Sequence, residues 1–553
     1  MYDSKNAHPI FIFALIALFF AYLGLENYTY ELTSRESILG NITRYSATHG
    51  LFENSMLGEQ EKRAPFFTWI SLFLGAGQVN QFTLRLVSLF SLLGIGIMAF
   101  FSARRFGGNK SAWPALIFSL SSVATINLAT EAEEGLLTAF LMSCAWMSWY
   151  GISRKSKRWF KAWFWGVFFT SLAAAVTGPY VYLFFYLPML LMTRPTDVRK
   201  RLVMLPHLSA LSFNIIIIIA FQYLFTNFAS SRELSFNFFS TDVTPPSKPD
   251  FEFDKGYIKD SAQFGINAIS YFMPWALFAW TGFCEAFRLI EKNSLAGPEI
   301  FRFLRRICCV LFFSFMFYPD TNAYSLIPLI YPLSVMTALH YPILERRHGE
   351  LFIKIIRILK LLLIPALVAP LYIIYTKWNS DLNAYQLKHL NAALVLSSCA
   401  FILLALSFFK FFKRHAPWLQ FSFLTLFIFM GIASARHLRF ERFEYSALAT
   451  ANTISSAVND QNTVIYNFSG KELRKELFYL SNESIPVVDS LAPEELPDRL
   501  YVIGTDSKPV RICTDSVRYK WQNISEEITI KEGKIVVYYG EVVIDQTPSP
   551  SGN

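Results

Sequence analysis

The chain of 553 residues is 53% hydrophobic and only 16% charged, and it contains 55 phenylalanines. A typical soluble domain is roughly a quarter charged, so this composition excludes a wholly soluble protein. The formal net charge of +9 comes from short basic clusters between apolar runs. Because these clusters form no continuous basic face, we do not expect nucleic acid as a partner.

The apolar runs predict an all-α polytopic membrane protein. A helix needs about 20 mostly apolar residues to cross the hydrocarbon core, and by that rule we expect about thirteen spans. No small-residue cleavage site follows the first run, so we interpret it as an uncleaved span rather than a signal peptide. The expected spans are residues 9–25, 81–102, 111–128, 135–152, 160–176, 179–193, 203–226, 264–287, 301–318, 322–343, 354–375, 391–410 and 417–435.

The loops between these spans alternate in charge, and this alternation predicts the topology. Lys and Arg in short loops stay on the cytoplasmic side. With a cytoplasmic N-terminus, an odd number of spans places the loop 26–80 and the segment 436–553 outside, which for a bacterial inner membrane means the periplasm. The basic loops contain Arg104, Arg105 and Lys110; Arg154, Lys155, Lys157 and Arg158; Arg194, Arg199, Lys200 and Arg201; Arg302, Arg305 and Arg306; Arg346 and Arg347; and Lys410, Lys413 and Arg414.

The composition changes after Arg436. Period-two and turn patterns predict short strands at 485–488, 500–503, 517–521 and 528–543, and the stretch 471–480 resembles a helix. We therefore expect a membrane domain over 1–435 and a small C-terminal α/β extracytoplasmic domain over 436–553.

Ionisable residues gather in the loops that we place on the external face. The first loop carries Glu36, Lys62 and Arg63, and the short acidic stretch 131–134 ends in Glu134. A phosphate leaving group needs cations to neutralise its charge, and an acceptor hydroxyl needs a carboxylate to orient or deprotonate it. Residues 35–48 and 66–74 have the pattern of amphipathic helices that could lie along the membrane surface.

Several short motifs recur in a fixed order along the chain. Together they resemble the GT-C fold glycosyltransferases, specifically the bacterial aminoarabinose transferase and protein mannosyltransferase group. In that group an Asp-Glu pair opens the first loop, and a Glu-Lys-Pro-Pro type motif leads into an aromatic segment. The matching segments are Arg35-Glu36, His49 to Phe52, Lys62 to Trp69, Leu84-Arg85-Leu86, Glu134 to Phe140, Thr177-Gly178-Pro179 and Tyr324 to Pro332.

The resemblance implies an enzyme that moves a sugar from a polyprenyl-phosphate donor to lipid A or another envelope acceptor. Carried over by position, Glu36 would be the base or the acid that orients the acceptor, and Glu134 would be the second acid. A divalent metal ion is compatible with this chemistry, although no His or Cys cluster in the sequence demands one. The implied donor-phosphate ligands are Lys62, Arg63, Arg85 and Tyr324.

Three departures from the family pattern keep other functions open. Arg35 stands where the pair has Asp, Ala64 where the motif has its first Pro, and Thr177 where a corner motif has Lys. They motivate a second hypothesis, a non-catalytic member that binds carrier lipid. A transporter or flippase is the third, but it would carry more ionisable residues at mid-depth than these spans do.

Single residues also have structural interpretations. Arg85 could reach lipid headgroups from the end of its span, and Tyr324 could belong to an interfacial aromatic belt. We expect Glu131 and Glu133 to be solvated, and His340 to be structural.

Overall fold

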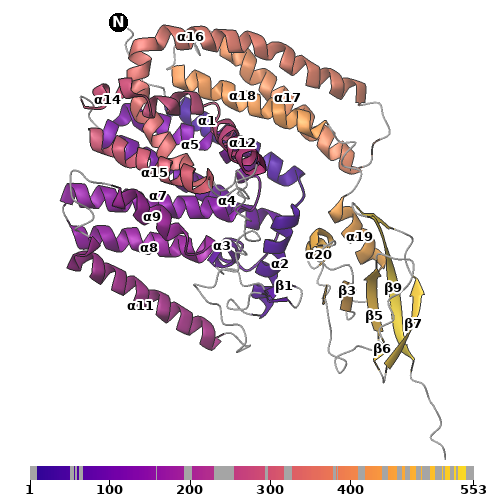
Figure 1. Cartoon of the computed structure of the whole chain (residues 1–553). Coiled ribbons are helices and arrows are strands. Elements are labelled where there is room, and N and C mark those ends of the chain that lie inside the picture. Colours follow the sequence, from indigo (N-terminus) through magenta and orange to yellow (C-terminus); the bar gives the residue numbers. More distant parts are fainter. Residues whose placement is uncertain are drawn as a thin grey trace, which may run out of the picture.

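The computed structural model gives a helical membrane bundle followed by a sheet (Figure 1). Structural statements below refer to the residues that it describes. These are 9–49, 55–56, 59–60, 66–156, 158–191, 202–228, 255–292, 297–316, 327–377, 382, 384–408, 417–438, 446–457, 464–467, 474–480, 487–488, 499–504, 513–514, 517–523, 528–530 and 533–543.

Seven helices in this part of the chain are long and apolar enough to cross a membrane. The chain is therefore a multi-pass, predominantly helical membrane protein, as the composition predicts. The seven candidate spans are Ile12–Thr29 in α1, Gln81–Gly107 (α4), Glu134–Arg154 in α7, Trp159–Thr177 (α8), Ile327–Leu361, which ends within α16, Ala384–Phe408 (α17) and Pro417–His437 (α18).

The other predicted spans correspond to shorter or more polar helices. Two of these, α9 (Val181–Leu190) and the first part of α11 (Leu205–Phe228), are apolar but short. By length and composition, the described helices therefore include fewer candidate spans than the thirteen or so that we expect from the sequence. The remaining bundle helices are α5 (Asn109–Leu120), α6 (Val123–Ala129), α12 (Lys255–Tyr271), α13 (Ala276–Ala279), η1 (Trp280–Gly282), α14 (Glu285–Lys292) and α15 (Pro298–Met316).

Two expected spans are broken where local hydrogen bonding competes with the helix. The run 111–128 breaks at Ser121 and Ser122, because Ser122 forms a capping box with Thr125 and so begins α6. The run 264–287 breaks after Tyr271. The two breaks meet, since the Trp275 indole N–H donates to the main-chain and side-chain oxygens of Ser121 at 3.2 and 3.0 Å.

Two further expected spans are joined. Helix α16 (Ile330–Lys377) joins residues 330–343 of the first run to the whole of 354–375, with non-helical backbone angles only at His348. Its second half carries a buried cation, because Lys360 Nζ donates to the Ser407 carbonyl at 2.6 Å. The expectation that the spans carry few charges therefore has an exception here.

The first loop forms two helices that pack against the bundle. Helix α2 (Ser34–His49) covers the predicted amphipathic stretch 35–48, and α3 (Phe66–Leu74) coincides with the second. Between them, β1 (Ser55–Met56) pairs with β2 (Glu59–Gln60). Helix α3 packs against α2, α4 and α8, which fixes the loop to the same end of the bundle as the start of α4.

The C-terminal part contains helices α19 (Ala447–Ala457) and α20 (Arg474–Leu480) beside one sheet (Figure 1). Its seven strands include the predicted ones, and the order is β4-β3-β5-β9-β7-β6 with β8 on β9; β3 is parallel to β4 and β5, and the other pairs are antiparallel. That these residues form a separate domain outside the membrane stays a prediction. The strands are β3 (Val464–Asn467), β4 (Val487–Val488), β5 (Arg499–Gly504), β6 (Cys513–Thr514), β7 (Val517–Asn523), β8 (Ile528–Ile530) and β9 (Gly533–Val543).

Candidate functional site

Glu36 lies in the first turn of α2, where it closes a capping box. The Glu36 main-chain N–H donates to the Thr33 hydroxyl at 3.2 Å, and the Thr33 main-chain N–H donates to Glu36 Oε2 at 2.7 Å. This reciprocal arrangement satisfies two amides that a helix start otherwise leaves unpaired. Local sequence therefore fixes the direction of the Glu36 side chain.

Glu36 and Arg85 form a bidentate ion pair, which we call the buried pair. Arg85 Nε donates to Glu36 Oε1 at 2.8 Å, and Arg85 Nη2 donates to Glu36 Oε2 at 3.0 Å. Each residue is only 1% exposed. Two charges removed from water to this extent are stable only when both are fully hydrogen-bonded.

The remaining N–H groups of Arg85 meet main-chain carbonyls at the end of α1 and after it. Nη1 donates to Asn27 at 2.9 Å and to Tyr30 at 3.0 Å, and Nη2 also donates to Glu31 at 3.1 Å. All five guanidinium N–H groups are thus used within the chain. Arg85 neither reaches lipid headgroups nor presents a donor to an external phosphate in this conformation.

The Glu36 carboxylate is equally saturated. Besides Arg85 and the Thr33 amide, it accepts the Ala132 main-chain N–H at 2.7 Å. A carboxylate offers about four acceptor sites, and four donors occupy them. In this geometry the buried pair holds the first loop against α4 and the segment before α7. The catalytic role of Glu36 and the phosphate-binding role of Arg85 stay predictions.

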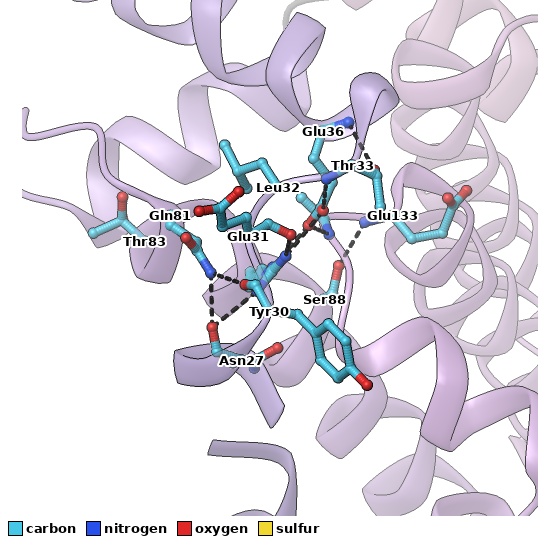
Figure 2. A network of polar contacts seen from close by, with 12 residues as sticks. Asn27, Tyr30, Glu31, Leu32, Thr33, Glu36, Gln81, Thr83, Ser88 and Glu133 are labelled. Atoms are coloured by element: carbon cyan, nitrogen blue, oxygen red, sulfur yellow. Dashed lines mark hydrogen bonds and ion pairs between the residues drawn. The ribbon is translucent and has the colours of Figure 1, made fainter. Parts of the chain in front are cut away.

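The loop before α7 completes this polar centre. Ser88, one turn beyond Arg85 on α4, accepts the Glu133 main-chain N–H at 2.8 Å. Figure 2 shows the Glu133 main-chain nitrogen facing Ser88, while the Glu133 side chain points away from Glu36. Glu133 is only 3% exposed, so the expectation that it is solvated was wrong; its carboxylate accepts the Gly135 amide at 3.3 Å at the start of α7.

Glu134, the second predicted acid, is the first residue of α7 and is half-buried. Its carbonyl accepts the Thr138 hydroxyl at 3.1 Å, and the same hydroxyl lies 3.2 Å from that of Thr177 at the end of α8. An added Cβ on Gly135 would stand 2.8 Å from Cδ1 of Ile327. The structure thus brings the acidic stretch, the Thr177 corner and the segment following Tyr324 to one end of the bundle.

The opposite end gathers residues from the basic loops. Arg105 Nη2 donates to the Gly151 carbonyl at 2.7 Å, and Arg154 pairs with Glu299 at 3.0 Å. The grouping agrees with the two faces predicted from charge alternation. Lys62, Arg63 and Tyr324, three of the implied phosphate ligands, lie outside the described residues.

His340 occupies a buried cluster in α16. Its Nε2 lies 3.3 Å from Glu291 Oε1, and Arg305 donates two hydrogen bonds of 2.8 Å to the Glu291 carboxylate. Burial raises the pKa of Glu291, but the hydrogen bonds from His340 and Arg305 outweigh it and hold the pKa below its ordinary value. The cluster ties α14 and α15 to α16, in agreement with a structural role for His340.

Sequence analysis missed a second buried cluster at the end of α1. Glu26 accepts from Arg436 Nη2 at 3.1 Å and lies 2.9 Å from His437 Nε2, while Nδ1 of His437 lies 2.8 Å from Nδ1 of His389. Tyr30 stacks on His437 with ring centroids 4.7 Å apart. The residues come from three distant helices, so no local signal links them. No group of three or more His, Cys, Asp or Glu in the described ranges could hold a metal ion.

The arrangement of helices defines a multi-pass membrane protein with a GT-C-like fold. Among solved structures, the chain resembles ArnT from Cupriavidus metallidurans bound to undecaprenyl phosphate, with a TM-score of 0.65 and 15% identity over 96% of this chain and 97% of that chain. The apo state of the same protein gives a TM-score of 0.66 with the same identity and coverage. No protein-family profile matches the chain, and no curated protein matches it by sequence.

Proposed function

We propose that this chain is a membrane glycosyltransferase that takes a sugar from a polyprenyl-phosphate donor and passes it to lipid A or another envelope acceptor. The reaction would take place at the end of the bundle that carries the first loop. In a bacterial inner membrane this end would face the periplasm. The likeness in fold to a protein bound to undecaprenyl phosphate supports the donor class.

One observation carries the proposal. The buried pair, the Glu133 loop and the start of α7 meet the Thr177 corner and the Ile327 segment at one end of the bundle. We propose that this rigid arrangement positions Glu134 to orient an acceptor hydroxyl and lets Lys62 and Arg63 stabilise a departing phosphate. The longest of these contacts joins Gly135 to Ile327, 192 positions apart in the sequence.

We propose a division of roles among the predicted residues. Glu36 and Arg85 would hold the first loop against α4 and α7, and Glu134 becomes the stronger candidate for contact with the acceptor because it is only half-buried. Lys62, Arg63 and Tyr324 remain the proposed donor-phosphate ligands. A divalent metal ion stays a prediction of the family resemblance, and the described residues form no group of three or more His, Cys, Asp or Glu that could hold one.

The test compares lipid A from cells that lack the protein with lipid A from cells carrying the intact chain or Glu134→Gln. Glu285→Gln is the matched control, because Glu285 is 91% exposed in α14. We expect a sugar-sized mass increase with the intact chain and the control, and its loss with Glu134→Gln. Identical spectra from deleted and complemented cells under inducing conditions would exclude lipid A as the acceptor.

A second function has a specific observation in its favour. Arg35 occupies the position of the family's Asp, and the neighbouring Glu36 is fully engaged by Arg85. A chain without a base could bind a polyprenyl phosphate without turning it over. Undecaprenyl phosphate binding by the purified protein, without transfer to any envelope acceptor, would favour this non-catalytic function.

A further inference from the structure

Helix α19, which begins the C-terminal part, is held by a carboxylate of the first external loop. Glu31 accepts the main-chain N–H groups of Ala447 at 2.9 Å and Leu448 at 3.3 Å, together with the Ser446 hydroxyl. A carboxylate at a helix N-terminus satisfies free amides and interacts favourably with the helix dipole. Because the Glu31 carbonyl also accepts Arg85 Nη2, this residue connects α19 directly to the buried pair.

Helix α20 makes a second connection through Tyr479. The Tyr479 hydroxyl accepts the Leu32 main-chain N–H at 3.0 Å and donates to Gln81 Oε1 at 3.0 Å. The Gln81 amide nitrogen in turn donates to the carbonyls of Asn27, at 2.8 Å, and Tyr30. The same two carbonyls accept the guanidinium of the buried pair, so the hydrogen-bond network is continuous from α20 to Glu36. Figure 2 shows the part of this network around Gln81, Asn27 and Tyr30.

The neighbouring Phe478 makes a third connection, to the middle of α2. A Cβ on Gly40 would stand 2.4 Å from the Phe478 ring, so only glycine allows this approach. The Arg44 guanidinium lies 4.4 Å from the centre of that ring and donates to the Phe478 carbonyl at 2.5 Å. Burial lowers the pKa of Arg44 to about 10, which leaves it charged at neutral pH.

We propose that α19 and α20 act as a brace that sets the position of α2 and of the buried pair, with Glu31 and Tyr479 as positioning residues. The C-terminal part would then belong to the catalytic architecture and would not be an independent recognition module. The mechanical part of this inference does not depend on the proposed function. Its catalytic consequence does.

Hydrogen exchange on the full-length protein in nanodiscs tests the mechanical part. Tyr479→Phe removes one hydroxyl but leaves the main-chain hydrogen bonds within α2 in place. The measured quantity is the exchange rate of the main-chain amides of α2. We expect about tenfold faster exchange in α2, as loss of a buried hydrogen-bond bridge implies, with α7 and α8 unchanged. The matched control is Tyr375→Phe, at a Tyr that is 74% exposed on α16. Unchanged exchange in α2, or an equal rise in all helices, would overturn the brace.

A double-mutant cycle gives an independent test. Gly40→Ala forces the Phe478 ring away, so it should speed exchange in α2 by about the same factor as Phe478→Ala. Once the ring is absent, Gly40→Ala should add less than a factor of two, because contacting residues are not additive. If the two substitutions multiplied each other's effect on the exchange rate, that result would contradict a direct contact between Gly40 and Phe478.

The catalytic consequence is tested by transfer assays normalised to the number of carrier-lipid binding sites. We expect Tyr479→Phe to lower kcat about tenfold with donor KM within a factor of two, since it disturbs α2 and the buried pair and not the segment that carries Lys62 and Arg63. Loss of folded protein alone would leave the normalised kcat unchanged. If the intact chain shows no sugar transfer, the proposed function fails. The hydrogen-exchange measurement would still show whether α19 and α20 hold α2 in place.

Discussion

Replacing Glu36 by Gln separates a positioning role from that of a catalytic base. The carboxylate accepts four hydrogen bonds, two from Arg85 and one each from the main-chain N–H groups of Thr33 and Ala132. A Gln side chain has one oxygen for about two of these donors, and its NH2 group would face the other two. The Arg85 charge would stay buried without an opposite charge.

The expected cost is large. Removing one partner of a buried ion pair destabilises a protein by about 3–5 kcal/mol. With an unfolding entropy of about 2 cal/mol/K per residue, this equals roughly 3–4 °C for a chain of this length, if it unfolds as one unit. A pure catalytic base, in contrast, could be replaced by its amide with little loss of stability.

Thermal unfolding in one detergent, read from tryptophan fluorescence, measures the effect. We would compare Glu36→Gln, Arg85→Gln and the double variant, with Glu285→Gln as the exposed control. If the two side chains form an ion pair, the double variant should lose less stability than the sum of the losses in the two single variants, by about 2 kcal/mol or more. A midpoint for Glu36→Gln equal to that of the control, accompanied by complete loss of transfer, would refute the positioning role and restore Glu36 as the base.

Three further predictions use other contacts. Glu291→Gln should be less stable than the intact chain at pH 7, and this difference in stability should narrow as the pH falls below about 4.5. The pKa of Glu291 is lower in the folded chain than in the unfolded chain, so its charge stabilises the fold above the unfolded pKa and ceases to do so as the pH falls through the folded pKa. Unfolding midpoints of both proteins across pH 3.5–7 measure the difference, and a constant difference would contradict the prediction. Gly135→Val should destabilise the start of α7 by about 1–3 kcal/mol through overpacking, and adding Ile327→Ala should recover part of that loss in the same melt. Glu26→Gln should cost about 1–3 kcal/mol, because Arg436 is 44% exposed and partly screened by solvent. It should also accelerate proteolysis at the end of α18, and protease resistance equal to wild type would exclude a role for Glu26 in joining α1 to α18.

Hydropathy and periodicity predicted most helices, because an apolar run surrounded by lipid must pair its main-chain N–H and C=O groups within itself, and a helix does so. They failed where a competing local interaction ends a helix, as Ser122 does with Thr125. They also failed at α16, where two runs continue as one element apart from His348. Hydropathy reports whether a segment is apolar, and it does not report where the backbone finds an alternative hydrogen bond.

The site was predictable in location but not in its pairing. Glu36 and Arg85 are 49 positions apart, and nothing in one dimension says that a carboxylate in a loop will meet a guanidinium on the next span. One local signal does exist, since Thr33 followed three residues later by Glu36 has the capping-box pattern. That pattern alone assigns the Glu36 carboxylate to the start of α2.

The most direct test of the proposed glycosyltransferase uses the purified, full-length protein in nanodiscs with a polyprenyl-phosphate donor labelled in its sugar. Lipid A is added as acceptor, and both the labelled product and the released polyprenyl phosphate are measured. The account predicts equal amounts of the two products with the intact chain, and neither with Glu134→Gln. Stable donor binding without release of polyprenyl phosphate, with lipid A or with other envelope acceptors, would contradict it and leave the chain as a carrier-lipid-binding protein.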